Sequence, residues 1–262
     1  MTRKDFIVLG ACIISLPGCR PASPSRSKSN ARRIQLLPVT HVRPRHFFIV
    51  YDISASYAAH LDEAKHLSHW HLIPLAQRGD ALTIATIQPR GDNDIGDKRA
   101  QVFAIPARVG GNRTKLRKAI ARAHAALERM HPLPPTEQGS DPLGVLINLS
   151  RCVDETRQPV ILVFSDCEPD LAPLRKEVPA FPGNPIVYFL NVPHHDTATL
   201  ERRKQHALGF CRTLKISEDS ARAWDFTETA QRFGQIARDL GRTPAAALRP
   251  GCAECDAHWG RG

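Results

Sequence analysis

The sequence predicts an α/β fold in which a doubly wound, mainly parallel central sheet is flanked by helices and carries one antiparallel edge strand. Three short apolar runs, at 47–51, 159–164 and 185–192, are rich in β-branched and aromatic residues. Such runs are typical of strands buried on both faces, as in parallel sheets. Segments with helical periodicity separate them, and this alternation favours a doubly wound arrangement.

The first half of the predicted domain begins with the strand at 47–51. A rough apolar stripe predicts a helix over 57–77, which Pro74 and Gly79 limit. The segments 80–88 and 101–105 flank a polar loop and are predicted to form a hairpin, which supplies the antiparallel strand. A helix over 113–130 has the most regular apolar spacing in the chain.

The second half begins after a Pro-rich break at 132–135 with a short helix that is apolar nearly all round, at 142–153. This helix is therefore expected to be deeply buried. The remaining predicted elements are the strands 159–164 and 185–192, a charged helix at 197–208, a short strand at 222–226 and an amphipathic helix at 227–240.

The amino terminus has the layout of a secretory signal, with a short basic head and an apolar segment at 6–16 that is too short to span a bilayer. Leu16-Pro17-Gly18-Cys19 resembles the lipobox of bacterial lipoproteins, which implies acylation of Cys19 and anchoring in the cell envelope, facing the periplasm or the cell surface. The predicted organisation is a signal peptide at 1–18, a flexible basic Pro/Ser-rich tether at 19–44, a folded domain at 45–241 and a tail at 242–262. An ordinary signal cleaved nearby is the alternative.

The composition is that of a globular protein, with 42% hydrophobic and 24% charged residues, but the net charge is +10. A strongly basic balance favours an acidic partner, an anionic membrane or a nucleic acid. The motifs of dedicated nucleic-acid-binding modules are missing and aromatic residues make up only 6% of the chain, so a nucleic-acid role is not favoured.

Oxygen-bearing side chains follow two of the buried runs and precede one helix. Asp52, Ser54 and Ser56 alternate directly after the first strand, so their oxygens can converge on one point. Ser140 lies before the helix at 142–153, and Asp166 follows the strand at 159–164. Carboxylate and hydroxyl oxygens are hard ligands of the kind that Mg²⁺ takes. The carboxyl edge of an α/β sheet is also the usual place for a ligand site.

These loops, in this order of elements, resemble the von Willebrand factor A (vWA) domain and its metal-ion-dependent adhesion site (MIDAS) over roughly residues 45–240. The family pattern is Asp-x-Ser-x-Ser after the first strand, a Thr in a later loop and a Thr-Asp-Gly context after the fourth strand. The resemblance implies a vWA/Rossmann-like fold with Asp52, Ser54, Ser56, Ser140 and Asp166 around Mg²⁺, or Mn²⁺ or Ca²⁺ in its place. Asp141 is the alternative to Ser140.

Two residues depart from the family pattern. Ser140 stands in place of Thr and keeps the hydroxyl. Cys167 stands where Gly is usual, so a positive φ there would strain the loop.

The resemblance also implies a function that is not enzymatic. Neutral hydroxyl ligands leave the ion much of its charge, and an acidic residue of a protein partner can then complete the coordination. The predicted function is divalent-metal-dependent protein binding, for adhesion or assembly. The alternatives are a metal-free site in which Asp52 caps its loop, and a metal-independent scaffold that binds acidic partners through its basic surface. A phosphatase-like hydrolase is disfavoured because Ser54 stands where that chemistry needs a second Asp.

Two further groups could bind metals. Cys252-x-x-Cys255-x-x-His258 has the spacing of half a zinc site, but a disulfide between Cys252 and Cys255 or a disordered tail is the favoured explanation. His66 and His69 have helical i, i+3 spacing, but histidines on a solvated helix face require no ligand.

Overall fold

The computed structural model describes residues 43–77, 79–87, 101–104, 113–134, 140–168 and 178–241, with the backbone alone at 101–104, 113, 115 and 116. The predicted signal at 1–18, Cys19, most of the tether at 19–44 and the tail at 242–262 lie outside the described residues. Within the described ranges, no helix is long and apolar enough to cross a membrane.

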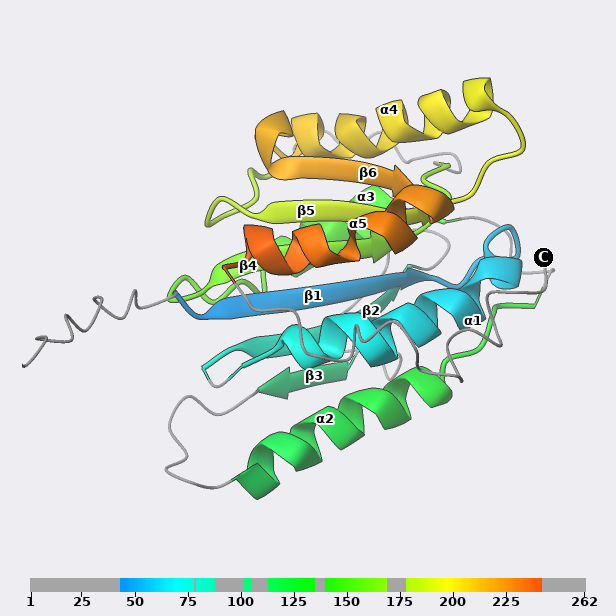
Figure 1. Cartoon of the computed structure of the whole chain (residues 1–262). Coiled ribbons are helices and arrows are strands. Elements are labelled where there is room, and N and C mark those ends of the chain that lie inside the picture. Colours follow the sequence, from blue (N-terminus) through cyan, green and yellow to red (C-terminus); the bar gives the residue numbers. More distant parts are fainter. Residues whose placement is uncertain are drawn as a thin grey trace, which may run out of the picture. The chain divides into compact units, whose positions relative to one another are not determined.

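The described part of the chain is built around a six-stranded sheet in the order β3-β2-β1-β4-β5-β6 (Figure 1). Five of these strands run parallel, and β3 pairs antiparallel with β2 at one edge. The predicted mainly parallel, doubly wound α/β fold is confirmed. The strands are β1 (Arg45–Asp52), β2 (Ala81–Ile87), β3 (Gln101–Ala104), β4 (Gln158–Phe164), β5 (Ile186–Val192) and β6 (Ala221–Asp225).

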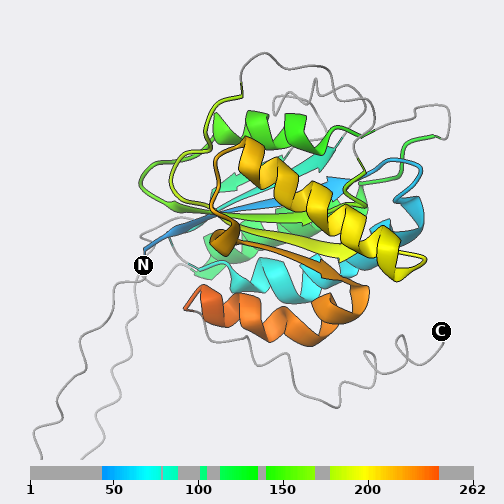
Figure 2. The same cartoon turned by 90° about the horizontal axis from the view of Figure 1, so that it is seen from above.

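Helices cover both faces of the sheet, with α1, α2 and α5 on one face and α3 and α4 on the other (Figures 1 and 2). Side chains of β1 alternate between the two cores: Phe47, Ile49 and Tyr51 belong to one, and Phe48 and Val50 to the other. This explains why the central strands are continuously apolar. The helices are α1 (Ala58–Leu67), α2 (Arg113–Glu128), α3 (Pro142–Ser150), α4 (Thr197–Thr213) and α5 (Phe226–Asp239).

The helix predicted over 57–77 is present, but it changes type in its second half. After α1 the chain forms a π-helical turn, η1 (Ser68–Leu72), and a 3₁₀ turn, η2 (Ile73–Leu75). Two residues account for the change. The Ser68 hydroxyl donates to the Ala64 carbonyl at 2.9 Å, which competes with regular helical bonding, and Pro74 has no N–H to continue the helix.

Aspartates begin three of the helices. The Asp141 carboxylate accepts from Gly144 N at the start of α3, and Asp196 accepts from Thr199 N at the start of α4. Asp225 forms a capping box with Glu228 at the start of α5. A second short 3₁₀ turn, η3 (Glu218–Ser220), precedes β6.

The strand order creates a switch point between β1 and β4. From β1 the chain continues to β2 on one side, whereas β4 leads to β5 and β6 on the other. Connections therefore diverge at the carboxyl ends of β1 and β4, and this is where open α/β sheets bind ligands. Tyr51 pairs with Phe164 in the register of these strands, so Asp52 and Ser165 come directly after paired residues.

Candidate metal centre

Asp52 is the last residue of β1, and its carboxylate is fully buried. Its Oδ1 accepts a hydrogen bond from the Ser54 N–H at 2.9 Å, and its Oδ2 accepts one from the Ser165 hydroxyl at 2.8 Å. The carboxylate therefore ties the loop after β1 to the end of β4. Ser165 has a positioning role here that the sequence analysis did not assign, although it directly precedes the predicted Asp166.

The hydroxyls of Ser54 and Ser56 lie 3.0 Å apart, so the oxygens of the first loop converge as the sequence predicts. Ser54 is buried and Ser56 is exposed. The Tyr57 N–H donates to the Ser54 carbonyl at 3.2 Å and closes the turn that leads into α1. This turn places the Ser54 hydroxyl on the buried side of the cluster and the Ser56 hydroxyl on its solvent-exposed side.

The loop after β4 brings Asp166 to the same edge of the sheet. Asp166 is buried, and its Oδ1 accepts from the Glu168 N–H at 3.1 Å. Cys167 has a φ of +57°, the left-handed conformation in which Gly is preferred. Its N–H donates to the Ser165 hydroxyl at 2.9 Å, and its side chain is fully buried in the core beneath α3 and α4. The loop thus keeps a conformation that suits Gly, with the strain offset by hydrogen bonding and burial.

The loop before α3 contacts the loop after β4 through Ser140, whose hydroxyl donates to the Glu168 carbonyl at 3.2 Å. Its neighbour Asp141 caps α3, accepting from the Gly144 N–H at 2.7 Å. Both residues are buried. Because the Asp141 carboxylate is used in capping, Ser140 is the better candidate of the two for the metal. The roles of Asp52, Ser54, Ser56, Ser140 and Asp166 as metal ligands stay predictions.

The electrostatics of the cluster favour a cation. Burial, and then the nearby charge of Asp166, raise the pKa of Asp52 to about 6, against the hydrogen bonds from Ser54 and Ser165 that lower it. A divalent ion would relieve this repulsion between buried carboxylates. Among the described residues, no group of three or more His, Cys, Asp or Glu side chains is placed to hold a metal. A metal held at this cluster would therefore need hydroxyl oxygens beside the two carboxylates, a donor set of the hard kind that Mg²⁺ takes.

Basic side chains from α1 and α4 lie beside the cluster. Burial lowers the pKa of His60, and so does the charge of Arg203, whereas the charge of Asp166 raises it. Arg202 and Arg203 both bond the Glu168 carboxylate, at 2.8 and 3.1 Å. Burial of Glu168 raises its pKa, but these hydrogen bonds and charges outweigh it and lower the pKa overall. The sequence analysis missed this rim because its members come from segments far apart in the chain.

The fold and the site together define a doubly wound α/β domain with an oxygen-rich cluster at its topological switch point. No protein-family model matches the sequence, and no curated protein sequence matches it either.

Solved structures that match this chain include the pilus adhesin SpaC from Lactobacillus rhamnosus GG in an open conformation. That match has 12% sequence identity and a TM-score of 0.46, and covers 76% of this chain and 30% of SpaC. A second is proximal thread matrix protein 1 (PTMP1) from the mussel byssus, at 9% identity and a TM-score of 0.43, covering 76% of this chain and 48% of PTMP1. PTMP1 with a zinc-occupied MIDAS motif matches at 13% identity and a TM-score of 0.44, covering 75% and 46%. This chain spans less than half the length of each of these proteins.

Proposed function

We propose that this chain is a vWA-type domain that binds a protein partner through a divalent metal ion, as an adhesion or assembly module of the bacterial cell envelope. Mg²⁺ is the proposed ion, with Mn²⁺ or Ca²⁺ as alternatives. The proposed function is not enzymatic. The observation that carries the proposal is the meeting of the Asp52 loop and the Asp166 loop at the switch point, where Ser165 bonds Asp52.

The proposed ligands are two carboxylates and three hydroxyls that come from three separate loops. When bound, the ion would supply a Lewis-acidic centre for an acidic side chain of the partner. The hydroxyls are neutral, so they leave the ion most of its charge. Asp52 and Ser54 are buried and hold the inner side of the cluster, whereas Ser56 is exposed at its mouth. The ligand set is Asp52, Ser54, Ser56, Ser140 and Asp166.

The rim also suits an acidic partner. Arg202 and Arg203 place two guanidinium groups at the rim, where both bond the carboxylate of Glu168. A partner carboxylate that approaches the ion would meet a favourable potential.

The location of the domain belongs to the same proposal. Lipid attachment at Cys19 would hold the protein on the membrane, and the tether at 19–44 would let the domain reach partners away from it. The lipobox-like segment and the secretory layout of the amino terminus support this.

Pull-downs from native envelope extracts test the function. Partner capture should be lost with chelator and with Asp52→Ala, because both remove the ion from the interface. Asp219→Ala is the matched control. This exposed carboxylate precedes β6, at the amino-terminal ends of the parallel strands and away from the cluster, and its loss should change nothing. Capture that survives chelator and Asp52→Ala would contradict the proposal.

A second candidate is a metal-independent scaffold that binds acidic partners through its basic surface. The net charge of +10 favours it, and α2 exposes Arg117, Lys118 and Arg122 along one side. Such binding would fall steeply with ionic strength, because exposed charges are screened within about 8 Å at physiological salt. Running the same pull-downs at two salt concentrations distinguishes the candidates: loss in salt with indifference to chelator identifies the scaffold.

A further inference from the structure

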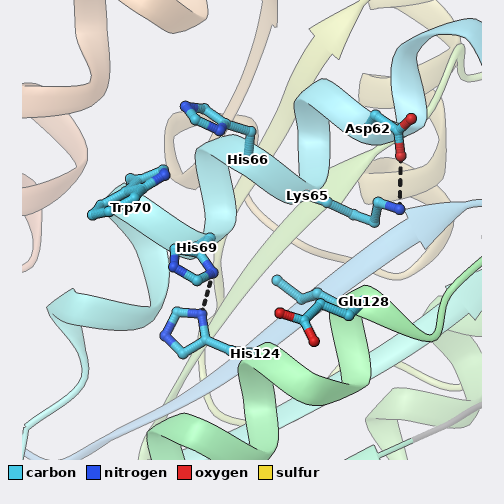
Figure 3. A pocket seen from close by; sticks show the side chains of 8 residues that line it. Asp62, Lys65, His66, His69, Trp70, His124 and Glu128 are labelled. Carbon is cyan, nitrogen blue, oxygen red and sulfur yellow. Dashed lines mark hydrogen bonds and ion pairs between the residues drawn. The ribbon is translucent and has the colours of Figure 1, made fainter. Parts of the chain in front are cut away.

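A pocket of about 520 Å³ lies between α2 and the segment formed by α1 and the π turn η1 (Figure 3). Its lining includes His66 from α1, His69 and Trp70 from η1, and His124 and Glu128 from α2. Trp70 is 48% exposed and is the exposed large hydrophobic side chain of the described residues. This pocket is separate from the Asp52 cluster and has no role in the proposed function.

Two histidines face each other across the pocket. The Nδ1 atoms of His69 and His124 lie 2.5 Å apart, and their ring centroids are 3.7 Å apart. Figure 3 shows His69 on η1 and His124 on α2 pointing toward one another. One ring donates its Nδ1–H to the Nδ1 of the other, and the tautomers of the two rings decide which is the donor. A metal bound at about 2.0–2.1 Å from each nitrogen would need the rings to separate by roughly 1 Å.

His69 lies on the π turn and faces α2. Along η1, His69 meets His124, whereas the His71 ring packs against Phe233 of α5 with centroids 5.0 Å apart. The turn therefore presents neighbouring histidines to different helices. Single π turns within helices are frequent at functional sites.

The charges around the pair favour a cation over an anion. Asp62 and Glu128 contribute two carboxylates to the lining, against the single ammonium of Lys65. Lys65 is itself engaged, by Asp62 at 2.7 Å and by the Met130 carbonyl at 3.2 Å. Neutral histidines therefore leave the lining with a net negative charge.

We propose that His69 and His124 form a second metal site, for a borderline transition metal such as Zn²⁺, Cu²⁺ or Ni²⁺, which fastens η1 to α2. Imidazole suits these ions, whereas the carboxylate and hydroxyl cluster at Asp52 suits Mg²⁺. The described residues place no third His, Cys, Asp or Glu in ligating position, so the remaining coordination positions fall to water or to donors beyond the described residues. These positions open beside Trp70.

Copper binding to the full chain tests the proposal. The titration uses Cu²⁺ in excess Mg²⁺, which fills the Asp52 cluster, and a Cys252→Ser/Cys255→Ser background, which removes the tail thiols as soft ligands. Bound Cu²⁺ should quench Trp70, because the Trp70 ring lies 4.9 Å from that of His69. Electron paramagnetic resonance should show two coordinated imidazole nitrogens per copper.

His69→Asn and His124→Asn should each weaken copper binding by roughly tenfold or more, since even indirect ligand partners are worth that much. His194→Asn, at an exposed histidine before α4, is the matched control and should bind like the parent. Trp70→Phe should lose the quenching but keep the two-nitrogen spectrum. Circular dichroism confirms that each variant folds.

A spectrum with fewer than two imidazole nitrogens in the parent protein would overturn the proposal without any variant. Unchanged binding in both histidine variants would overturn it as well. Neither result would affect the proposed Mg²⁺ function, because the readouts concern a different site and a different ion.

Discussion

Opposing effects act on Asp52 at the end of β1. Burial and the charge of Asp166 disfavour its ionised form, whereas hydrogen bonds from Ser54 and Ser165 favour it. The result is a carboxylate with a pKa of about 6, far above the usual value for aspartate. Such a group is costly to ionise, and a cation beside it would lower that cost.

The first prediction is that Mg²⁺ stabilises the protein against heat. At a concentration of about 100 Kd, the gain in unfolding free energy should be roughly 2.7 kcal/mol. The gain should be smaller near pH 5 than near pH 7.5, because protons compete with the ion below a pKa of about 6. Thermal unfolding with Mg²⁺ and with chelator measures it at both pH values.

Asp52→Ala should abolish this response to Mg²⁺, and Asp219→Ala should retain it. A melting temperature in the wild type that ignores millimolar Mg²⁺ would refute the metal site.

A second titrating residue lies away from the site. His46 is buried in β1, its Nε2 bonds the Thr83 hydroxyl at 2.9 Å and its ring stacks on Phe48. Among the described residues its Nδ1 has no hydrogen-bond partner. Burial, and then the charge of Arg157, lower the pKa of His46 to about 4. A proton added to this ring would be both buried and unpaired.

The second prediction follows from His46. The unfolded chain takes up this proton near pH 6.5 and the native protein only near pH 4, so stability is lost as pH falls through that window. The loss from this residue is at most about 3 kcal/mol. Denaturant unfolding of wild type and His46→Gln between these pH values isolates it, since Gln can still donate to Thr83 but does not titrate. Parallel pH profiles for the two proteins would contradict the assignment.

At the scale of elements, the start of α5 connects the edge strand β6 to the helix α4. Asp225 ends β6 and caps α5, accepting from the Glu228 N–H at 2.7 Å. The Glu228 carboxylate bonds back to the Asp225 N–H at 3.2 Å and pairs with Lys204 of α4 at 3.0 Å. Since α4 and α5 cover opposite faces, this pair links the two layers around the edge strand β6.

The third prediction concerns this cap. Asp225→Ala should lower the free energy of unfolding by about 1 kcal/mol, because it leaves a helix N–H without its acceptor. Chemical denaturation measures the loss, and Asp219→Ala, which removes an exposed carboxylate at the other end of β6 that caps no helix, should cost far less. Equal effects of the two substitutions would mean that the cap contributes nothing beyond surface charge.

For the whole molecule, anchoring decides where the domain can act. If Cys19 is acylated, the protein should sediment with membranes, and Cys19→Ser should release it or block its processing. A single acyl chain gives only marginal membrane binding, so stable anchoring requires the several chains of a lipoprotein. Fractionation and mass spectrometry of the mature amino terminus test this fourth prediction. A soluble wild-type protein cleaved elsewhere would refute it.

The sequence alone determined the fold class and the first loop of the site, because both depend on local patterns. Runs such as 159–164 are apolar at every position, and a strand with this pattern must be covered on both faces. Asp52, Ser54 and Ser56 lie within five residues, so one tight turn suffices to bring their oxygens together.

Only the tertiary structure decided what depends on strand order and on contacts between distant segments. Periodicity predicts that α1 and α2 exist, but the packing of both on one face is what brings His69 to His124, 55 residues away. The same holds for Ser165, whose bond to Asp52 requires β1 and β4 to be neighbours. Local sequence carries the preferences of each segment, whereas pairing across the sheet is set by how the crossovers pack, and no single segment encodes that.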